Sequence, residues 1–220
     1  MIELKNIYKS YGDLCVLNDV NLQVGRNEII SIVGPSGAGK TTLLQIAGTL
    51  DLPDSGSVTY EGVELTSLKD RKLSAFRNRN IGFVFQFHRL LPEFTAQENV
   101  AMPAMIGGSS KRQAMQRAAK LLDMLGLAER LRHRPSELSG GERQRAAIAR
   151  ALINSPKVVF ADEPTGSLDS RNRDEIRDLM ARLRTELGQT FVIVTHDPTV
   201  SRIADRVINM ADGRIITPYK

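Results

Sequence analysis

The strongest constraint on the fold is a glycine-rich string that lies between an apolar run and a helical pattern. Residues 29–33 read IISIV, which is typical of a buried strand, and residues 34–41 read GPSGAGKT. The string satisfies G-x-x-x-x-G-K-[ST] at every position, and residues 42–47 continue as a helix. This order predicts a phosphate-binding loop, because glycine lets consecutive backbone N–H groups point at one anion. The alternative is a glycine-rich turn that matches by coincidence.

Each residue type in this loop has a predicted role in holding a nucleoside triphosphate. The Lys40 ammonium is expected to reach the β- and γ-phosphates, and the Thr41 hydroxyl is expected to bind Mg²⁺. The helix that begins here adds partial positive charge beside the anion. The predicted nucleotide-binding residues of this segment are Gly34, Pro35, Ser36, Gly37, Ala38, Gly39, Lys40, Thr41 and Thr42.

Size and composition predict one globular domain. The chain has 220 residues, of which 41% are hydrophobic and 25% are charged, as in ordinary globular proteins. No apolar run approaches the roughly 18 residues that cross a bilayer, and the polar start MIELK does not resemble a signal peptide. A membrane role is therefore expected to come through a partner. The single cysteine, Cys15, excludes an internal disulfide and is expected to fill space in the core.

The basic balance of the chain does not indicate a nucleic-acid partner. The net charge is +5, but aromatic residues make up only 5% of the chain and no RNA-binding aromatic signature accompanies the basic residues. Solvated helix faces explain most of this charge, and attraction to an anionic membrane surface is a secondary possibility. No nucleic-acid partner is predicted.

The remaining sequence predicts alternating strands and helices with a helical lobe, approximately residues 87–154, inserted into the core of a single domain spanning residues 1–220. Phe87, Leu90, Leu91 and Phe94 are many large apolar groups for a loop, and they either pack that lobe or line a groove for a helix of a membrane partner. Strands are predicted at 2–7, 16–24, 58–62, 81–85, 158–161 and 191–194, helices at 68–78, 141–154 and 173–187, and a hairpin at 207–216.

Two carboxylates follow the apolar run at 158–161. Asp162 and Glu163 come directly after this predicted strand, where the chain reaches the edge of a sheet. In isolation this is only a strand that meets a polar turn. Beside a phosphate loop, Asp162 is expected to hold Mg²⁺ and Glu163 to polarise the attacking water.

The string LSGGERQR at residues 138–145 predicts a second anion site. It places Ser139, Gly140 and Gly141 at the start of a helix, where backbone N–H groups lack partners within the helix. One nucleotide does not need two such sites. The surplus therefore suggests that the second site serves a nucleotide held by another subunit.

Together, GPSGAGKTT, LSGGERQR and ADEPTGSLD resemble the nucleotide-binding subunit of ATP-binding cassette (ABC) transporters over essentially the whole chain. The resemblance implies an α/β fold with a RecA-like P-loop core, an antiparallel β lobe and an α-helical lobe. It also implies ATP and Mg²⁺ as cofactors. The residues that it assigns are Tyr11 to adenine stacking, Gln86 to Mg²⁺ or the water, Ser139, Gly140 and Gly141 to the partner's ATP, Glu163 to the general base, Asp169 to the dimer interface and nucleotide, and His196 to the γ-phosphate.

Several of these residues have simpler interpretations when each is taken alone. Tyr11 could be a surface tyrosine, and His196 could be a hydrogen-bonded histidine at the end of a strand. The context of Glu163 favours the functional role for His196. His88 and His133 are interpreted as surface residues.

The segment FQFHRLLPEFTAQENVAMP at 85–103 resembles the lipoprotein-releasing (Lol-type) branch of this family, and macrolide-efflux (MacB-type) and cell-division (FtsE-type) ATPases are related branches. Ser167 departs from the usual pattern, in which asparagine is common, and both chain ends are expected to be short. These departures leave the predicted ATPase chemistry intact, but they leave the exact cargo open.

The resemblance implies a homodimer that closes over two Mg-ATP, with membrane permease subunits as partners at the cytoplasmic face of the inner membrane. Lys40, Gln86, Glu163 and His196 are the expected catalytic residues, and Thr41, Gln86 and Asp162 the expected metal ligands. The alternative is a soluble ABC ATPase that acts on DNA or ribosomes, although the chain has neither the long coiled coil nor the tandem cassettes of those proteins. A GTPase is disfavoured because no N-K-x-D string occurs.

Overall fold

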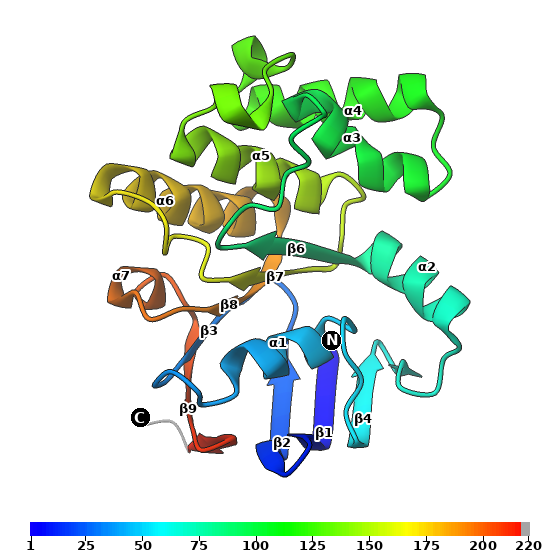
Figure 1. The fold of residues 1–220 in the computed structure, drawn as a ribbon, viewed down its shortest axis with the longest axis vertical. Helices are drawn as coiled ribbons and strands as arrows, with labels where there is room; N and C mark the ends of the chain where they lie inside the picture. Colours follow the sequence, from blue (N-terminus) through cyan, green and yellow to red (C-terminus); the bar gives the residue numbers. More distant parts are fainter. Residues whose placement is uncertain (217–220) are drawn as a thin grey trace.

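A computed structural model describes residues 1–216 and contains two sheets with helices around them (Figure 1). The larger sheet has six strands in the order β10-β9-β3-β8-β7-β6, all parallel except β10, which pairs antiparallel with β9. Its strands are β3 (Ile29–Val33), β6 (Ile81–Phe85), β7 (Val158–Asp162), β8 (Thr190–Val194), β9 (Arg206–Ala211) and β10 (Arg214–Ile216).

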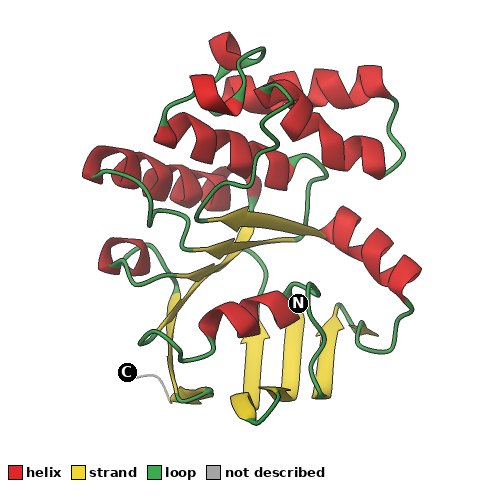
Figure 2. Ribbon diagram, viewed as in Figure 1, coloured by secondary structure: helices red, strands yellow, loops and turns green. Residues whose placement is uncertain are grey.

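The smaller sheet is antiparallel and forms a separate layer near the N-terminus. Its order is β2-β1-β4-β5, and the strands are β1 (Ile2–Tyr11), β2 (Leu14–Val24), β4 (Ser55–Tyr60) and β5 (Val63–Glu64). Figure 2 shows this layer beside α1 (Lys40–Ala47), which lies between the two sheets. Side chains from α1 and from both sheets form one continuous apolar cluster here.

Alternation along the buried parallel strands divides the core in two. On β7, Val158 and Phe160 join the cluster facing α1, whereas Val159 and Ala161 join the cluster on the opposite face. Successive side chains of a strand point to opposite faces, so a strand covered on both sides reads as an unbroken apolar run. This is why the run at 158–161 carries no polar residue.

Helices cover the face of the large sheet that lies away from the smaller sheet (Figure 1). Between β6 and β7 the chain forms a helical segment, and Thr95, Ser110 and Ser139 each cap one of its helices through a capping box. The helices of the structure are α1, α2 (Asp70–Asn80), α3 (Ala96–Ile106), α4 (Lys111–Met124), α5 (Gly140–Leu152), α6 (Ser170–Leu187) and α7 (Pro198–Ser201), with short 3₁₀ turns at Ala128–Arg130 and Pro135–Glu137.

The predicted α/β architecture, with a P-loop core, an antiparallel β lobe and added helices, is confirmed. The terminal hairpin is also confirmed, since β9 and β10 flank Asp212 and Gly213. In the described part of the chain, no helix is both long enough and apolar enough to span a bilayer.

Two predictions about single side chains are wrong. Cys15 is exposed rather than a core filler, because β2 lies at the edge of its sheet and turns this residue outward. His88 is only 9% exposed rather than a surface residue, because the turn after β6 folds its ring inward. In both cases the local sequence lacks the information about which neighbouring element covers the side chain.

Candidate nucleotide-binding site

The glycine-rich loop joins β3 to α1, as the sequence predicts. Gly39 is the residue that precedes α1 and has φ of 92°, a conformation that residues with a Cβ rarely adopt. A Cβ at this position would lie 2.7 Å from the Val16 carbonyl oxygen, and a Cβ at Gly34 would lie 2.1 Å from the Met210 carbonyl oxygen. Glycine is therefore needed at both positions, because the backbones of neighbouring strands approach the loop closely.

Two side chains of the loop occupy defined positions. Lys40 Nζ donates hydrogen bonds to the carbonyl oxygens of Gly34 at 2.9 Å and Pro35 at 2.8 Å, which hold its ammonium over the loop. Thr41 Oγ1 lies 3.2 Å from Oδ1 of Asp162, at the end of β7. This contact joins the phosphate loop to Asp162, the residue that the sequence predicts to share the Mg²⁺ site with Thr41.

Asp162 and Glu163 stand at the carboxyl end of β7. Burial raises the pKa of Asp162, and the adjacent Glu163 charge adds to this, while the Thr41 hydrogen bond opposes it. Glu163 has φ of 48°, a left-handed conformation that is uncommon for a residue with a side chain. Such strain at a residue with reactive chemistry is a feature of functional sites.

His196 contacts Glu163 directly. His196 lies in the loop after β8, the strand that pairs with β7. Its Nδ1 lies 2.8 Å from Oε1 of Glu163, although the His196 side chain is 73% exposed. The Glu163 backbone N–H also donates to the Val194 carbonyl oxygen at 2.8 Å. Adjacent parallel strands therefore bring these two residues together from positions 33 apart in sequence.

One cavity of about 520 Å³ gathers the loop, Glu163 and His196. It contains most of the predicted nucleotide-binding residues. Its lining consists of Leu14, Val16, Gly34, Ser36, Gly37, Ala38, Gly39, Lys40, Thr41, Thr42, Glu163, Val194 and His196.

Gln86 follows β6 and lies beside the loop after β7. The register pairs Phe85 with Asp162, so the next residue on each strand also lies near the other. A Cβ on Gly166 would come within 3.0 Å of Gln86 Nε2, and the Ser167 hydroxyl donates to the Gln86 carbonyl oxygen at 3.0 Å. Gln86 is therefore adjacent to the two carboxylates, although it does not line the cavity.

Tyr11 is held in place at the end of β1. Its hydroxyl donates to Oδ2 of Asp51 at 2.6 Å, and Lys9 Nζ lies 5.1 Å from the centre of its ring. The Asp51 hydrogen bond raises the pKa of Tyr11, and Thr42 of the phosphate loop lies near the same hydroxyl. The side chain is half exposed. These contacts fix an aromatic ring next to the loop.

The signature residues lie apart from this cavity. Ser139 caps α5: the Glu142 N–H donates to its Oγ at 3.2 Å, and its own N–H donates to Glu142 Oε2 at 2.7 Å. Neither Ser139 nor the following Gly140 and Gly141 lines the cavity of the phosphate loop. Gly141 sits against α6, where a Cβ would come within 2.0 Å of Asn172 Oδ1.

Asp169 is the N-cap of α6. Its Oδ1 accepts a hydrogen bond from the backbone N–H of Asn172 at 2.9 Å, and this bond lowers the pKa of Asp169. Asp169 and the signature residues thus lie on neighbouring helix starts, outside the cavity. Their predicted contact with a nucleotide stays a prediction.

A family comparison agrees with this geometry. The profile described as ABC transporter matches residues 17–166. The chain belongs to the ABC transporter family. It is an ABC ATPase, which binds ATP and hydrolyses it to power transport.

Curated relatives match this ABC ATPase over nearly its full length. It is 58% identical to the lipoprotein-releasing system ATP-binding protein LolD of Bacteroides fragilis strain YCH46, with 98% of this chain and 100% of that protein covered. It is 54% identical to the LolD protein of Porphyromonas gingivalis strain W83, with 99% of each chain covered. The predicted Lol-type resemblance is confirmed.

Solved structures share the fold. The ATP-binding cassette MJ0796, described as a dimer in a post-hydrolysis state bound to ADP and Pi, has a TM-score of 0.91 and 41% identity, with 100% of this chain and 98% of that chain covered. The cbiO1 protein of Clostridium perfringens has a TM-score of 0.88 and 29% identity, with 98% and 86% covered.

The sequence interpretation misses the residues that support the site from behind. Lys9 and Asp51 hold Tyr11, and Arg150 donates to the turn after Gln86. Asp51 sits in a turn, and Arg150 lies on a helix that also carries Arg143 and Arg145, so no local pattern marks either residue. The one available sequence signal is the position of Arg150 between Ala149 and Ala151, which places its charge next to buried helix positions.

Proposed function

We propose that this ABC ATPase works as a homodimer that binds two Mg-ATP and powers the release of lipoproteins from a membrane through permease subunits. The observation that carries the dimer is the separation of the two anion-binding elements, since Ser139 does not line the cavity of the phosphate loop. Lys40 and Ser139 would then meet across two copies. The cargo follows from the 58% identity to a lipoprotein-releasing ATPase.

Mg²⁺ fits the residues at the end of β7. The Thr41 hydroxyl and the Asp162 carboxylate are hard oxygen ligands 3.2 Å apart, and Mg²⁺ prefers such ligands together with phosphate oxygens and water. Burial raises the pKa of Asp162, and a cation would stabilise its charged form. Thr41, Asp162 and the Gln86 amide would hold the ion. Mg²⁺ neutralises phosphate charge when it is bound.

The chain's own residues divide the remaining chemistry. Glu163 accepts the proton of the attacking water, with its carboxylate held by His196 at 2.8 Å. Lys40 and the backbone N–H groups at the start of α1 stabilise charge on the phosphates, and the partner's Ser139 would close the site and exclude water. Tyr11 stacks on adenine, and Asp169 approaches the partner copy.

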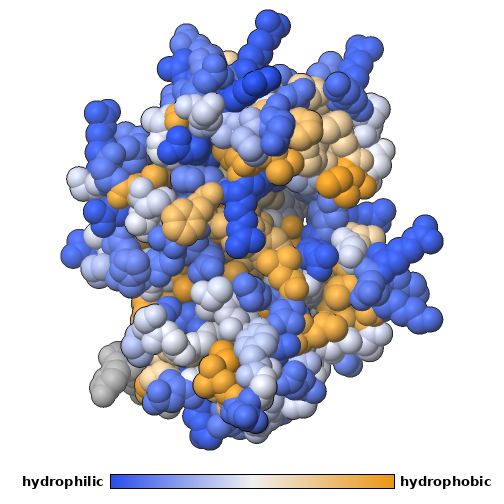
Figure 3. Space-filling view, viewed as in Figure 1, coloured by the Kyte–Doolittle hydropathy of each residue, from blue (hydrophilic) through white to orange (hydrophobic). Residues whose placement is uncertain are grey.

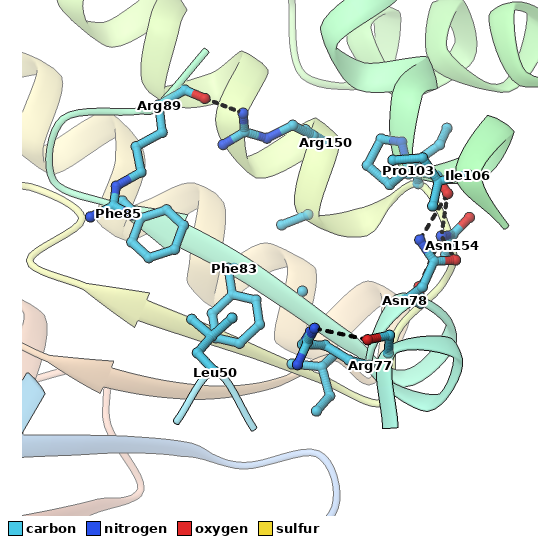
Figure 4. A pocket seen from close by; sticks show the side chains of 15 residues that line it. Leu50, Arg77, Asn78, Phe83, Phe85, Arg89, Pro103, Ile106, Arg150 and Asn154 are labelled. Atoms are coloured by element: carbon cyan, nitrogen blue, oxygen red, sulfur yellow. Dashed lines mark hydrogen bonds between the residues drawn. The ribbon is translucent and has the colours of Figure 1, made fainter. Parts of the chain in front are cut away.

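A groove beside the helical segment is the proposed docking site for a permease subunit. A cavity of about 460 Å³ lies between α2, β6, α3 and α5, and Phe83, Phe85, Ile106 and Arg150 are among its lining residues (Figure 4). Figure 3 shows a hollow with hydrophobic side chains on this face of the molecule.

The apolar residues after Gln86 differ in their surroundings. Phe87 is 75% exposed, and Leu91 and Phe94 are also exposed, whereas Leu90 packs on the core of the helical segment. Leu90 therefore packs the helical segment's own core, whereas Phe87, Leu91 and Phe94 are exposed, as the partner interpretation requires. An exposed Phe87 next to a groove suits a helix from a membrane subunit.

Complementation between two inactive variants tests the shared site. Lys40→Ala removes the phosphate contact of one chain, and Ser139→Arg blocks its signature end. In a mixture, one site of the heterodimer takes Lys40 from one chain and Ser139 from the other, so we expect ATPase activity that neither variant has alone. A mixture as inactive as its components would contradict the shared site.

The cargo needs a separate experiment. In proteoliposomes that contain the permease subunits, ATP should release an acylated lipoprotein with the wild-type chain and not with Glu163→Gln. ATP-driven release of a macrolide in the same proteoliposomes tests the MacB-type alternative. Binding to a cell-division partner tests the FtsE-type alternative. A nucleic-acid shift assay tests the soluble, non-transport alternative. ATP-driven release of a macrolide but no lipoprotein would overturn the proposed cargo.

A further inference from the structure

The turn that follows Gln86 has a backbone that needs support. His88 and Arg89 have φ of 55° and 48°, so two consecutive residues with side chains occupy the left-handed region. The left-handed conformation is unfavourable for a residue with a Cβ relative to the right-handed one. The His88 N–H donates to the Phe85 carbonyl oxygen at 3.0 Å, which reverses the chain immediately after β6. Contacts from outside the turn must stabilise this shape.

Arg150 makes those contacts from α5. Its Nη2 donates to the His88 carbonyl oxygen at 2.7 Å, and its Nη1 donates to the Arg89 carbonyl oxygen at 2.5 Å (Figure 4). A guanidinium is a rigid fork, and here its two nitrogens fit two consecutive carbonyls. The Arg89 guanidinium itself turns away and stacks over the Phe85 ring, 4.3 Å from the ring centre.

The His88 side chain lies against the other end of α5. The ring is buried and lies beside the Gly140 carbonyl, in the first turn of the helix that Ser139 caps. Burial lowers the pKa of the His88 ring, and the nearby Arg143 charge lowers this pKa further. The neutral ring is therefore favoured. The turn therefore lies against α5 near both ends: the His88 ring is beside Gly140, and the His88 and Arg89 carbonyls accept hydrogen bonds from Arg150.

We propose that Arg150 is a positioning residue for ATP hydrolysis. It holds the carbonyls of His88 and Arg89 on α5, so that the Gln86 amide stays beside Glu163 and moves together with the signature end of the same helix. The inference rests on the catalytic role proposed above for Gln86. A fixed turn transmits the position of α5 to Gln86, whereas a loose turn would leave Gln86 free to leave the site.

The comparison of Arg150→Lys with Arg184→Lys tests this inference. Lysine keeps the positive charge, but its single nitrogen cannot reproduce the fork. Arg184 is the matched control because it also reaches from a helix to a loop carbonyl, that of Asn27, at 3.2 Å. We expect Arg150→Lys to lower kcat roughly tenfold or more while the Kd for MgATP changes less than about twofold. Arg184→Lys should leave both constants near wild type.

A double-mutant cycle with Gln86→Ala separates positioning from general stability. If Arg150 acts through Gln86, Arg150→Lys should cost less than about twofold in kcat once Gln86 is already alanine. Amide hydrogen exchange should also quicken at residues 86–91 in Arg150→Lys and stay unchanged in the strand at 81–85. A purely structural role would lower kcat by the same factor in both backgrounds.

Each failure has a distinct meaning. Normal turnover in Arg150→Lys, or an equal loss of kcat in both backgrounds, overturns the positioning role while the role of Gln86 stands. Normal turnover in Gln86→Ala overturns the role of Gln86 and this inference with it. If Arg150→Lys does not fold, Arg150→Met keeps the packed stem, and the same cycle is measured with that variant.

Discussion

Nδ1 of His196 lies 2.8 Å from Oε1 of Glu163. The two residues follow the adjacent parallel strands β8 and β7, and the Glu163 backbone is held at φ of 48°. His196 and the backbone at Glu163 thus orient the carboxylate. We therefore expect His196 to act on the reaction by fixing the position of the proposed base, as the orienting member of a catalytic pair does.

Glu163→Gln should lower kcat by about two orders of magnitude or more, because the amide cannot accept the proton of the attacking water. ATP binding should be retained, since Lys40 and the loop are untouched. Gel filtration with MgATP should then show a trapped dimer. The control is Glu186→Gln, an exposed residue of α6 paired with Arg182, which should behave as wild type. Near-normal hydrolysis by Glu163→Gln would refute the assignment of the base.

His196→Ala should lower kcat by roughly ten- to a hundredfold, because the carboxylate loses its orienting partner. The Kd for MgATP should change little. In a chain that already carries Glu163→Gln, the same change should add little, since the two residues act as a unit. Single-turnover hydrolysis measures both effects. Additive losses in the double variant would mean that His196 acts independently of Glu163.

Tyr11→Ala should weaken ATP binding by about 1–3 kcal/mol, the typical contribution of an aromatic ring stacked on a base. Tyr11→Phe keeps the ring but loses its hydrogen bond to Asp51, so it should give a smaller, intermediate loss. Asp51→Ala should give an intermediate loss, because the ring loses the hydrogen bond of 2.6 Å that holds it. Isothermal titration with ATP and with ribose triphosphate separates the base contact from the phosphate contacts. Equal losses for both ligands would argue against stacking.

Asp162→Asn should abolish Mg²⁺-dependent hydrolysis and yet raise the melting temperature of the nucleotide-free chain at pH 7. Burial raises the pKa of Asp162 in the folded state, so the ionised carboxylate lowers stability at pH values above that pKa. The gain from asparagine should therefore vanish as the pH falls through the raised pKa to the ordinary aspartate value of about 3.9. Thermal unfolding between pH 7 and pH 4 in EDTA measures this. If the gain in melting temperature does not depend on pH, the burial of an ionised Asp162 is not its cause.

Much of the site can be predicted from the sequence because its parts are short and local. The phosphate loop, the pair Asp162 and Glu163, and the serine cap of α5 each consist of consecutive residues whose order dictates strand, turn or helix start. The helical pattern from 173 to 187 likewise gives α6 to within a few residues. These elements form in the same way wherever they are placed in the fold.

Tertiary structure decides which of these parts meet. The strand order puts β8 between β3 and β7, although β8 comes last of the three in sequence, and this alone brings His196 to Glu163. The same non-local packing buries His88, exposes Cys15, and sets Arg150 against the turn after Gln86. The sequence by itself thus determined the chemical groups and their local shapes. The contacts between them were decided only by the folded sheet, because burial and hydrogen bonding depend on neighbours that are remote along the chain.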